Sequence, residues 1–144
     1  MAIEYIERYR KYFYDPVAES YEEKFWEAVK RRELVFQRCP QCGEWQHPPR
    51  PCCHKCKNFE LEWMRSSGKG KVFSWVVFTR EVNPLFKVPF DVVVVEMEDE
   101  KGVRFVSNMV GTVPDEIEFD MPVELTWIDA TEDQPLPVFR KATA

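Results

Sequence analysis

Two Cys-x-x-Cys pairs constrain this chain more than any other feature. Cys39 and Cys42 form the first pair, Cys53 and Cys56 form the second, and ten residues separate the pairs. Four thiolates at such spacing are the usual ligands of a tetrahedral structural zinc site. Sulfur is a soft ligand that selects zinc or iron over magnesium or calcium. The sequence therefore predicts a structural Zn²⁺ site on these four residues, with iron as the open alternative.

The fifth cysteine, Cys52, lies beside Cys53 and is the competing ligand. Cys53 keeps the two-residue spacing to Cys56, whereas Cys52 would lengthen it, so we expect Cys52 to be a spare thiol. Paired disulfides are the other interpretation. An odd number of cysteines and the charged N-terminal stretch, which has no signal-peptide pattern, both argue against it.

The chain contains no pattern that predicts catalysis. A site closed by four cysteines keeps no open position for water, so its metal is structural. The two histidines, His47 and His54, both lie in the cysteine-rich segment and form no nucleophile–base arrangement. We therefore predict no catalytic residues in this chain.

The N-terminal half predicts helices followed by a metal-binding ribbon. Helical spacing of apolar residues predicts one helix over residues 3–14 and a second from residue 20 to residue 32, which begins with a capping box of Ser20 and Glu23. A strand over residues 34–38 enters the first cysteine pair. Another over 59–64 leaves the second pair, with Phe59, Leu61 and Trp63 facing inward. This order predicts N-terminal helices over 1–33 and a rubredoxin-like zinc ribbon over 34–67.

The C-terminal half predicts a β-barrel. Residues 66–70 are expected to be a flexible joint, and strands are expected at 71–80, 90–97, 103–110, 123–128 and 136–140. In the first of these strands, Val72, Ser74, Val76 and Phe78 are assigned to one face. Five strands without helical periodicity favour a five-stranded OB-fold barrel over 68–144. The fold class is thus α+β, mostly β.

Charge separates two broad classes of binding partner. The net charge of −5 divides into +3 for residues 1–71 and −8 for residues 72–144. Zinc ribbons and OB folds both occur in nucleic-acid-binding proteins, which is the alternative function. Phosphate contacts supply much of that affinity, so an acidic barrel argues against it and leaves only the ribbon as a small opening.

The sequence also leads to predictions about membrane insertion and cellular location. No run of about 18 apolar residues is present, so no membrane span is expected. Cysteines that bind a metal are typical of a reducing compartment, which favours the cytoplasm.

The combined motifs resemble one family across residues 18–141. They are Phe25-Trp26, Cys-x-x-Cys-Gly at 39–43, Pro48-Pro49-Arg50, the second cysteine pair, Gly68 and Gly70, Ser107-Asn108, and residues 136–140. Together they resemble the acyl-CoA-associated zinc-ribbon plus OB-fold proteins, the domain-of-unknown-function thirty-five group. Cys52 departs from that pattern, and the role of residues 1–17 is left open.

The resemblance implies a function. Members of that family accompany thiolase-superfamily enzymes: thiolases, acyltransferases, hydroxymethylglutaryl-CoA synthases and steroid side-chain aldolases. It implies a non-catalytic subunit of a hetero-oligomer that binds or positions acyl-CoA, or completes the active site of its partner.

Five residues are candidate contacts to CoA or to the partner. They are Trp26, Arg50, Asn108, Phe139 and Arg140. Each polar candidate has an alternative role. The alternative for Arg50 is a salt bridge to an acidic barrel loop. The alternative for Asn108 is a structural hydrogen bond, and for Arg140 it is a contact that fixes the C-terminal tail.

Overall fold

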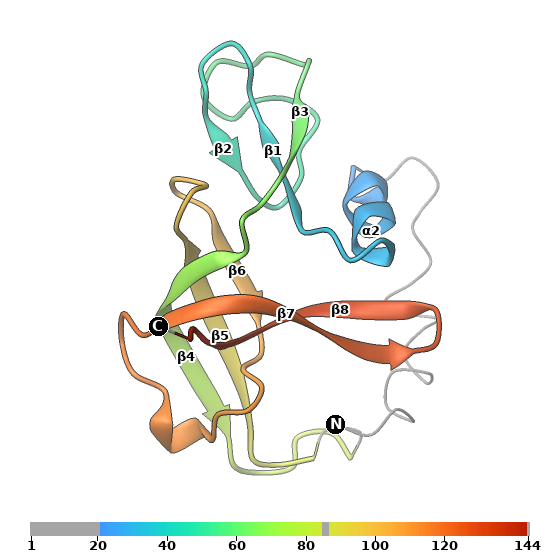
Figure 1. The fold of residues 1–144 in the computed structure, drawn as a ribbon. Helices are drawn as coiled ribbons and strands as arrows, with labels where there is room; N and C mark the ends of the chain where they lie inside the picture. The colour runs from blue at the N-terminus through green and yellow to red at the C-terminus, as the bar shows by residue number, and fades with distance from the viewer. Residues whose placement is uncertain (1–20, 85–86, 144) are drawn as a thin grey trace.

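The computed structural model describes residues 21–84 and 87–143, which form a helix and two antiparallel sheets (Figure 1). The smaller sheet has the order β2-β1-β3 and the larger one has the order β6-β5-β4-β7-β8. The fold is mostly β, as predicted. The helix predicted over residues 3–14 lies outside the described residues, and the predicted domain boundaries remain a prediction.

Helix α2 (Glu23–Lys30) packs on both sheets through one face. Phe25, Ala28 and Val29 are its buried residues and are spaced about one helical turn apart. The helix begins at Glu23 with no side-chain cap, so the predicted start after Ser20 is wrong. Tyr21 is 58% exposed, and burial begins only at Phe25. Because helices in proteins are held mainly by tertiary packing, the buried face outweighs the capping signal.

The ribbon sheet joins β1 (Val35–Arg38), β2 (Trp45–Gln46) and β3 (Glu62–Arg65). The prediction that Phe59 faces inward is wrong, because Phe59 precedes β3 and is 76% exposed. Its neighbours form a turn instead: the side chain of Asn58 donates to the carbonyl of Glu60 and accepts from the N–H of Glu60. This local bonding competes with strand formation.

The larger sheet closes into the predicted OB-fold barrel. Its strands are β4 (Lys69–Phe78), β5 (Phe90–Met97), β6 (Arg104–Ser107), β7 (Pro122–Thr131) and β8 (Gln134–Lys141). A short 3-10 helix, η1 (Pro114–Glu116), interrupts the β6–β7 connection. A parallel bridge between the segment after β6 and Phe139 of β8 closes the barrel. The N–H of Phe139 donates to the backbone carbonyl of Asn108 at 3.0 Å, and the carbonyl of Phe139 accepts from the N–H of Val110 at 2.8 Å.

A β-bulge in β4 changes which residues face the core. The register slips between Val72 and Ser74, so Val72 is fully buried whereas Val76 is 54% exposed. The sequence assigned both to one face, which is wrong, because one extra residue inverts the alternation that follows it. The outward face of the strand therefore carries Ser74, Val76 and Phe78.

The joint between ribbon and barrel is packed, not flexible as predicted. Gly68 has φ +77°, and a Cβ on it would lie 2.6 Å from Cβ of Leu125. A Cβ on Gly70, already inside β4, would lie 2.6 Å from Cγ1 of Val95. The glycines are therefore required by close packing rather than by mobility.

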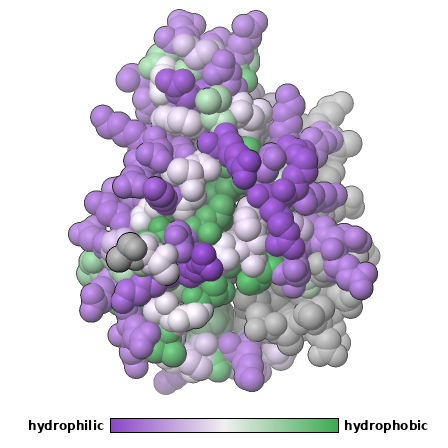
Figure 2. All heavy atoms as spheres, viewed as in Figure 1, coloured by the Kyte–Doolittle hydropathy of each residue, from purple (hydrophilic) through white to green (hydrophobic). Residues whose placement is uncertain are grey.

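Three rings and an imidazole hold helix, ribbon and barrel together. Phe25 of α2, Phe36 of β1 and Phe105 of β6 surround His47, with ring centroids 5.2–5.4 Å from the imidazole. All three phenylalanines belong to a single core that extends into the barrel. In the view of Figure 2, hydrophilic residues cover most of the ribbon, and hydrophobic ones gather in a strip over the barrel. No helix in the described ranges is long and apolar enough to cross a membrane.

A matched pair of substitutions tests the ring junction. Phe105→Ala should lower the free energy of unfolding by about 3–5 kcal/mol, because it leaves a cavity between ribbon and barrel. Phe59→Ala, which removes the same side chain from an exposed site, should change it by less than about 0.5 kcal/mol. Urea denaturation of both variants measures the difference, and equal losses would contradict the described packing.

Candidate metal centre

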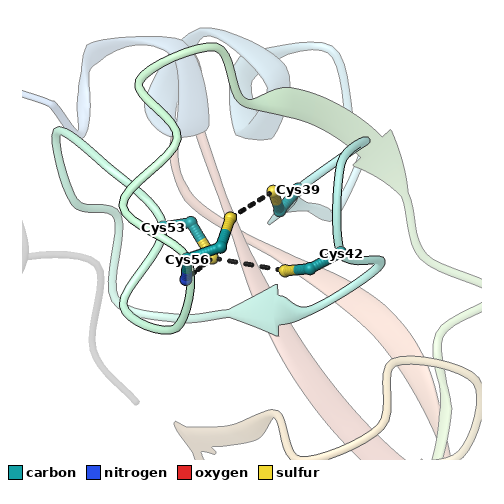
Figure 3. A group of neighbouring side chains, drawn as sticks. All are labelled: Cys39, Cys42, Cys53 and Cys56. Atoms are coloured by element: carbon teal, nitrogen blue, oxygen red, sulfur yellow. Dashed lines mark hydrogen bonds between the residues drawn. The ribbon is translucent and has the colours of Figure 1, made fainter.

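The four predicted cysteine ligands come together at one end of the ribbon. Sγ of Cys39 lies 3.5 Å from Sγ of Cys56, and Sγ of Cys42 lies 3.6 Å from Sγ of Cys53. All four sulfurs lie within 4.8 Å of one another, and Figure 3 shows the side chains converging from two loops. Sulfurs of a tetrahedral zinc or iron site, with bonds of about 2.3 Å, are separated by comparable distances. The geometry of Cys39, Cys42, Cys53 and Cys56 therefore suits a four-sulfur metal site.

The two cysteine loops repeat the same backbone geometry. In the first loop, Cys39 donates its N–H to Glu44 and its carbonyl accepts from Gly43, both at 2.8 Å. In the second loop, Cys53 donates to Asn58 at 2.8 Å and accepts from Lys57 at 3.0 Å. The equivalent fifth positions, Gly43 and Lys57, both have left-handed φ angles of 73° and 66°. The turn thus demands a conformation that glycine adopts freely and lysine adopts at a cost.

The electrostatics of the cluster suit a bound cation. Desolvation opposes a charge on Cys39, yet N–H donation from Cys42 and a hydrogen bond from Cys56 outweigh it and lower the pKa of Cys39 to about 6. The N–H of Glu44 favours the thiolate of Cys42, but desolvation and the neighbouring thiols raise its pKa to about 12. Four thiolates cannot all form at such short distances without a compensating charge. A divalent cation removes that conflict, so the donor set fits a metal.

Two buried glutamines fix the segment that joins the cysteine loops. Gln46 donates to the side-chain oxygen of Gln37 at 2.9 Å and to the carbonyl of Cys52 at 3.2 Å. Gln37 also accepts from the N–H of Arg50 at 2.8 Å and donates to its carbonyl at 3.1 Å. Sequence analysis missed this pair. A glutamine in a short strand beside a cysteine loop could have indicated it, because a buried side-chain amide needs several hydrogen-bond partners.

The two candidates near the ribbon, Trp26 and Arg50, lie on different elements. Trp26 is on α2, half-buried, with its ring edge-on to Phe25 at 5.2 Å. Arg50 is exposed, its backbone is held by Gln37, and its side chain forms no ion pair within residues 21–84 and 87–143. The predicted alternative, a salt bridge from Arg50 to a barrel loop, is thus absent from the described part of the chain.

The other three candidates meet at the barrel closure. Asn108 donates to the carbonyl of Asp91 and accepts from the N–H of Phe139, which supports the structural alternative for this residue. Phe139 is fully buried, so its ring offers no accessible surface here. Arg140 forms an exposed ion pair at 2.9 Å with Glu124 on the neighbouring strand. The barrel candidates are therefore separate from those near the ribbon.

His47 is a half-buried, neutral imidazole beside the cysteine loops. Burial lowers its pKa from 6.5 to about 4, and its Nδ1 has no hydrogen-bond partner among the described residues. Since the unfolded chain takes up this proton below about pH 6.5 and the folded chain does so only near pH 4, stability falls as the pH drops through that interval.

Acidification of a His47→Phe variant tests this effect. Between pH 7 and pH 5, the wild type should lose about 2 kcal/mol more unfolding free energy than the variant. Any acid release of the metal is common to both proteins, so the difference between the two curves isolates His47. Parallel curves would show that the imidazole is not protonated on unfolding.

Metal analysis of single cysteine variants tests the ligand set. The wild type should contain about one metal per chain, and elemental analysis distinguishes zinc from iron. Cys42→Ala should lose the metal and unfold the ribbon, because a structural zinc site of this kind contributes roughly 10 kcal/mol or more. Cys52→Ala should keep it. Full occupancy in Cys53→Ala together with none in Cys52→Ala would reverse the assignment.

Two family models match successive parts of the chain. The model described as "ChsH2, rubredoxin-like zinc ribbon domain" matches residues 26–62. The model described as "ChsH2, C-terminal OB-fold domain" matches residues 63–127. The two matches agree with the metal ribbon and the barrel of the structure.

Two curated relatives are subunits of hydratases. The chain is 44% identical over 119 residues to the "Probable enoyl-CoA hydratase alpha subunit" of Thermomonospora curvata, covering 82% of this chain and 37% of that protein. It is 39% identical over 105 residues to the "3-oxo-4,17-pregnadiene-20-carboxyl-CoA hydratase alpha subunit" of Mycobacterium tuberculosis, covering 73% and 33%. The chain thus spans about a third of the length of these relatives.

A solved structure matches nearly end to end. It is titled "Ltp2-ChsH2(DUF35) aldolase"; the matched chain is 41% identical, the TM-score is 0.78, and the match covers 85% of this chain and 94% of that one. Given this match and the two family models, the chain belongs to the ChsH2 (DUF35) family of zinc-ribbon and OB-fold proteins.

Proposed function

We propose that this chain is a non-catalytic subunit of a thiolase-superfamily complex that acts on acyl-CoA. It holds the partner in an active assembly and helps to position the CoA thioester or complete the partner's active site. The assembly is a hetero-oligomer located in the cytoplasm, and the metal in the ribbon is Zn²⁺ with a structural role.

The match to the ChsH2(DUF35) chain of an Ltp2 aldolase structure carries this proposal. An identity of 41% with a TM-score of 0.78, over 94% of that chain, supports a shared mode of assembly as well as a shared fold. The best-supported partner is therefore a thiolase-like aldolase that cleaves a C–C bond. The two hydratase relatives have names that contain a CoA thioester, and one of these is a steroid side-chain derivative. Acyl-CoA, including the steroid type, is accordingly the proposed substrate class.

The site chemistry supports a non-catalytic role. The four cysteines leave no open coordination position for a reacting water. His47, a possible base by residue type, lies among three phenylalanine rings with a pKa of about 4, and its Nδ1 has no hydrogen-bond partner among the described residues. Chemistry in such a complex would take place on the partner, with this chain contributing binding surface.

Arg50 is the proposed contact to CoA phosphate or to the partner. Its backbone is fixed on both sides by Gln37, so the exposed guanidinium starts from a preorganised position. Arginine binds phosphate and carboxylate through a planar pair of donors. Trp26, Asn108, Phe139 and Arg140 remain proposals. The burial of Phe139 limits it to supporting its neighbours, and Arg140 must leave Glu124 to reach a ligand.

Reconstitution with an Ltp2-type aldolase tests the proposal. The two chains should co-elute on size exclusion, and aldolase turnover of acyl-CoA should require this chain. Arg50→Ala should raise the KM for the CoA substrate about five- to tenfold with kcat little changed, as expected for loss of uniform binding.

Arg80→Ala supplies the control, since Arg80 is also exposed but follows β4 at the other end of the barrel. It should leave both constants unchanged. Equal turnover by the partner alone, without co-elution, would overturn the proposed function.

A further inference from the structure

An open cleft lies between α2 and one face of the ribbon sheet, away from the cysteine cluster. Its volume is about 330 Å³, and Ala28 and Val35 are its buried lining residues. The remaining lining residues are Lys24, Glu27, Arg31, Glu33, Trp63 and Arg65. A cleft of this size is at the lower end of the range that holds small ligands.

Secondary structure explains why these side chains gather there. Lys24 and Ala28 of α2 and the C-cap residue Arg31 are spaced by four and three residues, so they share one side of the helix. In the ribbon, Arg65 pairs with Val35 and Trp63 lies two residues earlier on the same strand, so their side chains share one face of the sheet. The helix face and the sheet face meet at the cleft.

The cations of the cleft are available to an anion. Lys24 and Arg65 form no ion pair within the described residues. Arg31 meets Glu33 at 3.5 Å and donates to the carbonyl of Glu27 at 3.2 Å, but 60% of its side chain is exposed, and an exposed ion pair of this kind contributes little. The lining carries three cations and two carboxylates, a net charge of +1 in a chain of net −5. A phosphate therefore competes well for these side chains.

Trp63 adds a flat aromatic surface beside the cations. It is half-buried, packs against the core on one side and lines the cleft on another. Cations alone would accept any small anion, and an indole alone would accept any apolar ring. An aromatic wall beside phosphate-binding cations is the combination that nucleotides use, because a base stacks while its phosphates pair.

We propose that this cleft binds a phosphorylated adenine nucleotide, with the base on Trp63 and the phosphates on Lys24, Arg31 and Arg65. The inference rests on the proposed function and deepens it, since coenzyme A ends in a 3′-phosphorylated adenine nucleotide. Arg50 extends the same ribbon face: its backbone is bonded to Gln37, which pairs directly with Trp63 across the sheet. The cleft then holds the nucleotide end of the coenzyme, and Arg50 lies toward the next part of the ligand.

Calorimetric titration of the full, metal-loaded chain with adenosine 3′,5′-bisphosphate tests the cleft. Binding is expected in the micromolar to sub-millimolar range and should weaken with added salt. Arg65→Ala should weaken it about tenfold by removing a phosphate partner, and Trp63→Leu should weaken it about tenfold by removing the stacking surface. Lys101→Ala, an exposed lysine in the β5–β6 turn, should bind as the wild type does. Far-UV circular dichroism of each variant confirms that it is folded.

Several outcomes would overturn the proposal. No binding by the wild type at millimolar nucleotide, or wild-type affinity in both Arg65→Ala and Trp63→Leu, would exclude the cleft. Pyrophosphate binding as tightly as the nucleotide would show an anion site without base recognition. A single-stranded RNA 12-mer binding far more tightly than the mononucleotide would indicate nucleic acid instead.

Co-elution with the aldolase partner is measured separately. Loss of nucleotide binding with intact co-elution would refute the cleft and leave the proposed function standing. Nucleotide binding without co-elution would refute the assembly role and leave the cleft as a site in its own right.

Discussion

The contact of Phe36 and Phe105 across His47 is the interaction on which the arrangement of the whole chain depends. The ribbon is a three-stranded sheet with little interior of its own, and its centre strand sends Phe36 out of the ribbon toward the barrel. Phe25 brings the helix to the same point. Since a small sheet buries too little surface to be stable alone, a metal on the four cysteines would hold one end of the ribbon, and the rings hold the other. The two ends are thus stabilised by different chemistry.

Close packing also marks the joint between ribbon and barrel. The backbone passes from β3 to β4 through Gly68 and Gly70, where a Cβ would clash with barrel residues. Glu100, in the turn after β5, is fully buried next to this joint, and desolvation raises the pKa of its carboxyl against the hydrogen bond from Ser66. Two glycines and one buried acid thus lie where the ribbon meets the barrel.

Sequence reasoning succeeded where local spacing decides the structure. The clustering of the four cysteines follows from the spacing of the two pairs, and the barrel strands follow from runs of β-branched residues such as those of β5. It failed where long-range packing decides. The bulge between Val72 and Ser74 reverses which residues of β4 face the core, and no residue type in that stretch indicates a bulge. The hydrophobic side chain of Phe59 suggested a core residue, but hydrogen bonds between Asn58 and Glu60 place Phe59 in a turn. The cleft at Trp63 joins a helix and a strand more than thirty residues apart along the chain, which spacing cannot reveal.

The two cysteine loops are alike in hydrogen bonding but unequal in backbone strain. Glycine occupies the left-handed position of the first loop at no steric cost, whereas Lys57 occupies the same position of the second with a Cβ that resists it. While the metal is bound, its bonds to sulfur hold both turns alike. Loss of a metal would therefore relieve backbone strain in the second loop, which carries Cys53 and Cys56, and not in the first. The cost of keeping all four sulfurs together thus falls on the second cysteine pair.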